Sequence, residues 1–332
     1  MCDKQLNFSS SNINSSLNDI SQIIQNFDKI NIKELEPTTK NVNKNIFDGD
    51  LNIIIDELIN FILDGLNEGK DEEVVKHHVL NYVNKHKLMI HEFYYWLLNN
   101  QNNSNSIYLL GYFNYHGIVT NINKKKAIEL YQKAAKLENC VAQLILASMY
   151  IYGNGIDKNY DLAFELSKKL AEKGIPNAIN KLGYCYNNKI GTEINEQKAF
   201  ELYKKAADLG NSTGISNLGW CYDKGIGTAT NKSKAFELYQ KAADLGNSFG
   251  INNLGAYYKY GVVTDVDEQK AFELYQKAAN LGNHLAQYNL ALKYENGDEI
   301  EKDINKAIYW YSKSAEQGYK YAQKKLKKLS KK

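Results

Sequence analysis

The sequence predicts an all-α solenoid, a stack of helix-turn-helix repeats, and two observations with one spacing carry this prediction. A run close to AFELYQKAA recurs every 36 residues, and its first alanine falls at Ala127, Ala163, Ala199, Ala235, Ala271 and Ala307. A leucine keeps the same spacing at Leu110, Leu146, Leu182, Leu218, Leu254 and Leu290. A fixed period of this length is typical of supersecondary units that stack on one another rather than of a single globular core.

The segments before the repeats follow a different pattern. Residues 1–46 are rich in Asn, Ser, Lys and Thr with little periodicity, so we expect a disordered leader. Between 47 and 104, apolar residues recur at helical spacing in three stretches, which begin near Leu51, Val74 and Ile90. Because a solenoid leaves an apolar face at each end, we expect segment 47–104 to be a helical cap on the first repeat.

Each of the six repeats in 105–318 is expected to contain two antiparallel helices. In the third repeat the pattern predicts helices over Asn177–Asn188 and Asn195–Leu209, with a turn between them. Gly210 is expected to end the second helix, since glycine adopts the left-handed backbone conformation without steric cost.

The last segment, 319–332, contains seven lysines and apolar residues on one side of a predicted helix. We expect it to be a C-terminal capping helix with a solvated outer face. A signal for nuclear import or an anionic partner is the alternative, although short basic runs indicate this only weakly.

Composition limits the class of partner. The chain carries a net charge of +3 and no arginine, and specific reading of phosphate or guanine depends on the arginine fork. Nucleic acid is therefore not expected. The most apolar stretch, 51–66, contains charged residues and cannot span a membrane, so we expect no membrane partner and a cytoplasmic location, or a nuclear one from the lysine-rich tail. Cys185 and Cys221 are interpreted as small buried residues.

No group of residues predicts catalysis or a bound cofactor. Four histidines (His77, His78, His86 and His91) cluster near the N-terminus, but their spacing does not place two ligands on one helix face with two more nearby. The Gly-x-Gly runs lack the Lys-Ser/Thr pair and the preceding strand of a phosphate-binding loop. We therefore expect no enzyme activity, no metal and no cofactor.

The repeats resemble a known family. The fourth copy contains GISNLGWCYDKGIG from Gly214 to Gly227, followed by Lys234-Ala235, Ala242-Ala243 and Gly246, and this pattern is similar to the Sel-1-like repeat, a relative of the tetratricopeptide repeat. The resemblance implies a right-handed α/α solenoid that acts as a non-enzymatic protein-protein interaction scaffold. A regulatory adaptor of a kinase signalling or protein quality-control complex is the alternative. The first repeat departs from the pattern at Asn114 and Glu138.

The resemblance also implies that the first helix of each repeat lines the concave side, where a protein or peptide partner would bind. Positions spaced i, i+3, i+7, i+11 along that helix are expected to face the groove. The candidate residues are Asn177, Asn180, Tyr184, Asn188, Ser216, Trp220, Lys224, Asn252, Tyr260, Tyr288 and Asn296. Trp220 is the preferred anchor. The same spacing also fits Tyr184 and Trp220 packing against neighbouring helices.

Overall fold

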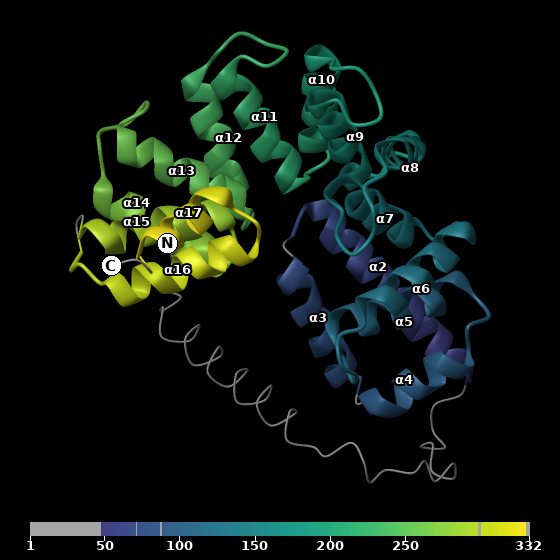
Figure 1. Ribbon diagram of the computed structural model, residues 1–332. Helices are drawn as coiled ribbons and strands as arrows, with labels where there is room; N and C mark the ends of the chain where they lie inside the picture. Colours follow the sequence, from purple (N-terminus) through teal and green to yellow (C-terminus); the bar gives the residue numbers. More distant parts are fainter. Residues whose placement is uncertain (1–47, 71, 87, 298–299, 330–332) are drawn as a thin grey trace, which may run out of the picture. The chain divides into compact units, whose positions relative to one another are not determined.

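A computed structural model describes residues 48–70, 72–86, 88–297 and 300–329, and all regular structure in these residues is α-helical (Figure 1). The expected leader over 1–46 and the last three residues of the tail lie outside this description. Among the described helices, none is both long and apolar enough to cross a membrane.

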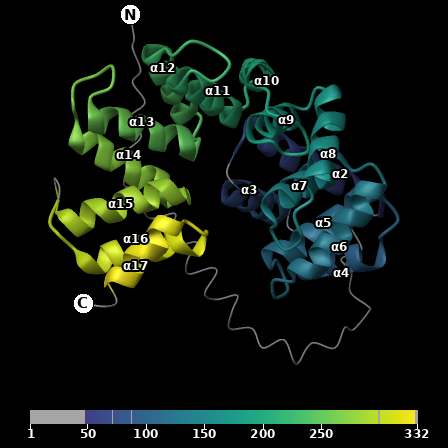
Figure 2. The same cartoon turned by 45° about the horizontal axis from the view of Figure 1, so that its top comes forward.

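Three helices precede the repeats, and their positions confirm the three predicted stretches: α2 (Asp48–Glu68), α3 (Glu72–Lys85) and α4 (Ile90–Asn99). The first helices of the six repeats, here called A helices, are α5 (Ser104–His116), α7 (Cys140–Tyr152), α9 (Pro176–Asn188), α11 (Ser212–Lys224), α13 (Ser248–Tyr260) and α15 (His284–Asn296). The second helices, here called B helices, are α6 (Lys124–Lys136), α8 (Tyr160–Glu172), α10 (Glu196–Asp208), α12 (Lys232–Asp244), α14 (Glu268–Asn280) and α16 (Ile304–Glu316). A final helix, α17 (Lys320–Leu329), follows them. From α4 to α17, consecutive helices contact one another in chain order, as an α-solenoid requires (Figure 2).

Asparagine and aspartate side chains begin almost every helix of the repeats. In the fourth repeat, the side-chain oxygens of Asn211 and Asn231 accept hydrogen bonds from the backbone N–H groups of Gly214 and Lys234. Such caps satisfy N–H groups that have no partner within the helix. The exception is α9, where Ile175 makes no side-chain cap. There Pro176 occupies the first helical position, which suits proline because it has no N–H to satisfy.

Within a repeat, the A and B helices approach closely because a small residue faces a large one. A Cβ atom added to Gly183 of α9 would lie 3.0 Å from two ring carbons of Tyr203 on α10, and the fourth and fifth repeats contain the same pair. In the second repeat Ala147 replaces the glycine and Ser167 replaces the tyrosine. In the sixth repeat Ala291 replaces the glycine while the tyrosine is kept as Tyr311, and both belong to one buried cluster. The residue that faces the tyrosine is therefore always glycine or alanine.

Between repeats, an aromatic pair recurs with a lysine beside it. Phe200 of α10 meets Tyr222 of α11 edge to face at 5.5 Å, and Lys234 Nζ lies 4.6 Å from the centre of the Tyr222 ring. The same three positions are in contact in Phe164–Tyr186–Lys198, Phe236–Tyr258–Lys270 and Phe272–Tyr294–Lys306. Aromatic pairs of this kind contribute about 0.5–1.5 kcal/mol beyond the area they bury, so each interface between these repeats gains a similar increment.

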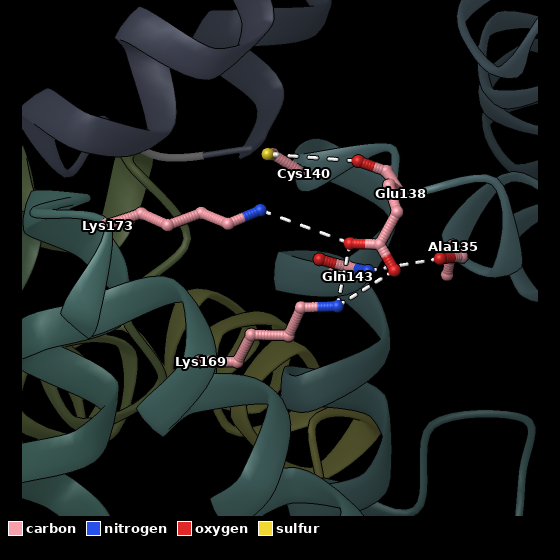
Figure 3. Close-up of polar contacts among 6 residues, drawn as sticks. All are labelled: Ala135, Glu138, Cys140, Gln143, Lys169 and Lys173. Atoms are coloured by element: carbon pink, nitrogen blue, oxygen red, sulfur yellow. Dashed lines mark hydrogen bonds and ion pairs between the residues drawn. The ribbon is translucent and has the colours of Figure 1, made fainter.

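Two residues other than glycine adopt the left-handed conformation where most repeats have glycine. Lys189 follows α9 at φ 56°, and Glu138 follows α6 at φ 63°. Figure 3 shows the Glu138 carboxylate directed toward Lys169 of α8 and Lys173, the residue after α8, with the two Nζ atoms 2.6 Å and 4.0 Å from Oε2. The hydrogen bond from Lys169 is the main cause of a lowered pKa of Glu138. Glu138, which stands where the other repeats have glycine, therefore forms an ion pair with the second repeat.

The helices before the repeats take two different courses. Phe93 and Tyr94 of α4 pack against Phe113 of α5, at the first repeat. Helix α2 contacts α5, α7 and α9, which are the A helices of three successive repeats. Its inner residues Ile55 and Leu58 are fully buried. Helix α2 is therefore part of the core and lies along the A helices of repeats 1–3.

Candidate partner-binding face

In repeats 3–6, one side of the A helix is partly or fully exposed, and this side and its equivalent in repeats 1 and 2 are called the A face here. In α9 it contains Asn177, Lys181, Tyr184 and Asn188, which lie within about 60° of one another at 100° per residue. The equivalent residues of α11, α13 and α15 are partly or fully exposed: Thr213, Asn217, Trp220 and Lys224; Phe249, Asn253, Ala256 and Tyr260; Leu285, Asn289, Leu292 and Asn296. These side chains differ between repeats, whereas the packing positions are nearly identical.

Four of the predicted groove residues (Asn180, Ser216, Asn252 and Tyr288) do not belong to this face, and three of them are buried. The side chains of Asn180, Ser216 and Asn252 are 7%, 3% and 5% exposed. They lie where successive A helices contact one another, and Asn180 Oδ1 accepts a hydrogen bond of 2.9 Å from Asn217 Nδ2 of the next repeat. The prediction that these three face an open groove is therefore wrong, because the side of the helix that they occupy is used for stacking.

The sequence analysis did not predict that the position one residue later lies on the A face. Asn217, Asn253 and Asn289, here called the asparagine row, are partly exposed on the A face of α11, α13 and α15. Asn289 Nδ2 donates to Asn252 Oδ1 at 3.1 Å, as Asn217 does to Asn180, so the row also joins successive repeats. Identical asparagines at a single position of three consecutive copies were the signal in the sequence that could have identified it.

Three of the four aromatic candidates, Tyr184, Trp220 and Tyr288, are partly buried. Trp220 packs at the edge of the core cluster that contains Tyr203 and Leu218. The Tyr184 ring lies 6.2 Å from that of Tyr152 on the preceding A helix. Tyr288 is packed more closely, with its ring 5.2 Å from Tyr319. Tyr184 and Trp220 therefore combine packing with an accessible edge, and Tyr288 belongs to an aromatic cluster at the C-terminal end.

The last position of the A face is exposed in repeats 3–6. Tyr260 has 67% of its surface exposed, and Asn188, Lys224 and Asn296 are exposed as well. Asn188 Nδ2 donates to the Tyr184 carbonyl oxygen of its own helix. This position therefore exposes a tyrosine ring, two asparagine amides and a lysine ammonium group to solvent at the C-terminal ends of the A helices.

The N-terminal ends of α9 and α11 are already occupied by the chain itself. Asn177 Nδ2 donates to the Leu66 carbonyl oxygen at 2.8 Å, and Asn211 Nδ2 donates to that of Asn67 at 2.7 Å. Ser212 Oγ donates to the Gly69 carbonyl oxygen at 3.0 Å. The predicted site residue Asn177 therefore holds the end of α2, whose last carbonyl groups would otherwise lack partners within the helix.

Two charged groups of α9 and α11 have strongly shifted pKa values. Burial lowers the pKa of Lys181 to about 8. On α11, burial acts to raise the pKa of Asp223, but hydrogen bonds from Lys224, Lys232 and Tyr257 outweigh it and lower the pKa to about 2. The Tyr257 hydroxyl, from the next repeat, donates to Asp223 Oδ1 at 2.6 Å. The Asp223 carboxylate is therefore neutralised by Lys224 and Lys232, and its hydrogen bond with Tyr257 joins two repeats.

The described residues contain no group of three or more His, Cys, Asp or Glu side chains placed to hold a metal ion. His77 and His78 lie on α3, where His77 Nε2 is 3.0 Å from Asn81 Nδ2 and His78 packs edge to face on Phe61. Cys185 and Cys221 are free, fully buried thiols, which confirms their interpretation, and burial raises their pKa values to about 11 and about 12.

Comparison with known proteins gives matches over the whole repeat region. The model of the Sel1 repeat family matches residues 104–139, 140–175, 176–211, 213–247, 248–283 and 284–319. Among solved structures, a Sel1 repeat protein from Oxalobacter formigenes is 28% identical with a TM-score of 0.56, and the match covers 70% of this chain and 93% of that one.

Two further structures are similar at lower TM-scores. A protective antigen of uropathogenic Escherichia coli that displays an SLR fold is 29% identical with a TM-score of 0.47, and the match covers 70% of this chain but only 50% of the antigen. The immunity protein Pa5087 from Pseudomonas aeruginosa is 26% identical with a TM-score of 0.44, over 55% of this chain and 67% of that one.

Proposed function

Because this chain belongs to the Sel1 repeat family, whose members generally mediate protein-protein interactions, we propose that it is a non-catalytic scaffold that binds a partner protein. The binding surface is the A face of repeats 3–6, and the ligand is a peptide segment or a helix of the partner. If the partner is a kinase or a component of protein quality control, the protein acts as a regulatory adaptor.

The observation that carries this proposal is the contrast between the two sides of the A helices. The packing side uses the same small and aromatic residues in most copies, and these residues are buried. The A face exposes Tyr260, Asn188 and Lys224 at one equivalent position of three repeats, although none of them is required for stacking. Residues that are free of packing duties and differ between copies suit recognition of one specific partner.

The residue types also suit a polypeptide ligand. An asparagine amide can donate to and accept from a peptide backbone, and the row of three asparagines repeats this capacity along the stack. Aromatic rings such as those of Trp220 and Tyr260 give large contact areas while few rotatable bonds are immobilised. Together they provide hydrogen bonds for an extended chain and apolar contacts for its side chains.

The proposal is limited to repeats 3–6 because some of the equivalent positions in the first two repeats are occupied by buried apolar residues. In α5 the A-face residues Leu109 and Tyr112 are buried, and Val141 of α7 is buried as well. Helix α2 contacts both α5 and α7. In repeats 3–6, in contrast, side chains at the corresponding positions reach solvent.

Affinity capture followed by mass spectrometry tests the proposed surface. The wild-type protein is compared with a variant in which Tyr184, Trp220 and Tyr260 are changed to alanine. The matched control changes two exposed tyrosines of B helices, Tyr160 and Tyr309, to alanine. Circular dichroism and thermal melting establish that all three proteins are folded.

We expect a partner that is retained by the wild-type protein and the B-helix control but lost by the A-face variant. Because Trp220 is partly buried, the single Tyr260→Ala change serves as a second A-face variant with no packing role. Equal retention of the same partners by all the proteins would move the binding surface away from the A face.

A further inference from the structure

The segments on either side of the repeats carry opposite charge. Segment 48–104, which contains α2, α3 and α4, has ten acidic residues and four lysines. Segment 319–332, which contains α17, has seven lysines and no acidic residue. The repeats between them have nearly equal numbers of lysines and acidic residues. The repeat array is therefore preceded by an acidic segment and followed by a basic one, although the whole chain has a net charge of only +3.

The basic charge is gathered on one side of α17. Lys320, Lys324 and Lys328 are exposed and lie within about 80° of one another at 100° per residue; they are called the lysine stripe here. Tyr321, at the edge of the stripe, has 61% of its surface exposed. The other side of α17 packs through Ala322 into the last core cluster. Among the described residues, no carboxylate forms an ion pair with the lysine stripe.

Helix α2 has an exposed side of opposite charge. This side, here called the acidic stripe, contains Asp56, Glu57, Asn60 and Asp64. Asp56 accepts a hydrogen bond of 2.7 Å from Asn105, and Glu57 accepts one from the Tyr82 hydroxyl. Asp64 has no partner in the described part of the chain. Both donors to the stripe are neutral groups, so no lysine neutralises its three carboxylates.

The two stripes form no ion pair with each other within the described chain. Helix α17 packs against α16, which belongs to repeat 6, whereas α2 packs along the A helices of repeats 1–3. We propose that the lysine stripe of α17 binds the acidic stripe of α2 in a second copy of this chain. The inference goes beyond the proposed function, because this contact uses neither the A face nor its partner.

The spacing of the charges suits two helices that lie side by side. Lys320 to Lys328 and Asp56 to Asp64 each extend over about 12 Å, at 1.5 Å per residue. In an antiparallel arrangement, Lys320 lies beside Asp64 and Lys328 beside Asp56. Lys320 then approaches the C-terminal end of α2, where the helix dipole favours a cation. The Tyr321 ring adds apolar contact area at the edge of the lysine stripe.

A two-fold symmetric pair forms this contact twice, because α17 of each copy lies on α2 of the other. Such an arrangement closes at a dimer and leaves no stripe unused. Exposed ion pairs are individually weak, and one pair of helices is small for a stable interface. We therefore expect a reversible dimer that weakens as salt screens the charges.

Sedimentation equilibrium of the full-length protein, over a wide range of concentration and at low and high salt, tests the proposal. The basic variant combines Lys320→Glu with Lys324→Glu. The acidic variant combines Asn60→Lys with Asp64→Lys, which leaves the hydrogen bonds of Asp56 and Glu57 in place.

The matched control combines Lys204→Glu and Lys241→Glu, two exposed lysines of the B helices α10 and α12. It has the same net charge as the basic variant, so it separates the effect of the stripe from that of overall charge. Circular dichroism and thermal melting establish that each protein is folded. Tyr260→Ala is included to separate this contact from binding at the A face.

We expect the wild-type protein to dimerise and the basic variant to do so with a dissociation constant raised by about tenfold or more. The acidic variant should be weakened similarly, whereas the matched control and Tyr260→Ala should behave as the wild type does. An equimolar mixture of the basic and acidic variants should dimerise again, because each stripe then meets one of opposite charge.

A wild-type protein that remains monomeric at every concentration would overturn the inference and leave the proposed function intact. A dimer that the matched control weakens as much as the basic variant does would also overturn it, as would a mixture of variants that does not associate. Fluorescence anisotropy with labelled duplex DNA and sedimentation with anionic lipid vesicles complete the test. Binding of either by a monomeric wild-type protein, lost in the basic variant, would assign the lysine stripe to that ligand instead.

Discussion

The side-chain amide of Asn177 donates a hydrogen bond of 2.8 Å to the carbonyl oxygen of Leu66, which lies 111 residues earlier in the chain. The same carbonyl oxygen accepts the backbone N–H of Gly69 in the turn that ends α2. This contact joins the end of α2 to the start of the third A helix. Helix α2, which also contacts α5 and α7, therefore ends beside the A helix of repeat 3.

Replacement of Asn177 by alanine removes the donor to Leu66 while α2 remains packed through its apolar residues. We expect a loss of about 1 kcal/mol in the free energy of unfolding, as is usual for one hydrogen bond. Urea denaturation followed by circular dichroism measures it. Asn188→Ala is the control, because Asn188 is exposed and bonds only within its own helix in the described structure. Equal effects of both changes would show that the bond to α2 contributes nothing.

Lys189→Gly is expected to stabilise the protein. Lys189 has φ 56°, a conformation that costs a residue with a Cβ about 1–2 kcal/mol. Part of this gain is lost because glycine is more flexible in the unfolded chain, so about 0.5–1 kcal/mol should remain. Thermal and urea unfolding measure the difference.

Glu138→Gly relieves the same kind of backbone strain but removes contacts with two lysines, Lys169 and Lys173, whereas Lys189→Gly removes a contact with Glu193 alone. We therefore expect a smaller gain than for Lys189→Gly. High salt should bring the two substitutions closer together, because it screens exposed ion pairs. A destabilising Lys189→Gly would mean that its contact with Glu193, 3.2 Å away, outweighs the strain.

Asp223 should make the protein sensitive to acid. Its pKa of about 2 in the folded state lies below the ordinary value of 3.8, so its contribution is fully present above about pH 4 and is lost as the pH falls toward 2. Asp223→Asn should therefore cost about 2 kcal/mol of stability near pH 7, and the difference from wild type should shrink below pH 4. A difference that stays constant from pH 7 to pH 2 would contradict this assignment.

Lys181→Met should increase stability. Because burial lowers the pKa of Lys181 to about 8, the charged form is disfavoured in the folded protein near pH 7. We expect a gain of about 1–2 kcal/mol at pH 7, after allowance for partial screening by solvent. The gain should decline between pH 8 and pH 10.5, where lysine loses its proton in the folded state before the unfolded one. A loss of stability at pH 7 would show that Lys181 has a structural role.

The repeat architecture could be predicted because its determinants are local. The capping bond from Asn211 to the N–H of Gly214 spans three residues, and the contact of Gly183 with Tyr203 lies within one repeat. Each such interaction recurs in the next copy, so the 36-residue period records it several times over. The positions of α9 and α10, and the end of α10 before Gly210, follow from these signals.

Of the predicted site residues, those at the ends of the A helices are exposed, whereas Asn180, Ser216 and Asn252 are buried. Asn180 and Lys181 are adjacent, but Asn180 is buried against the next repeat and Lys181 reaches the A face. Both positions are polar in α9, so composition did not distinguish them. Which of the two residues is buried depends on the angle at which successive A helices pack, and the sequence of one helix does not specify that angle.

The sequence by itself determined the helix pairs, their caps, the order of the repeats and the residue types available on the A face. Only the tertiary structure decided the course of α2 and therefore which part of that face remains open. The hydrogen bonds that hold α2 join Asn177 to Leu66 and Asn211 to Asn67, across 111 and 144 residues. Helical periodicity arises from contacts three and four residues apart, so it cannot encode contacts over such distances.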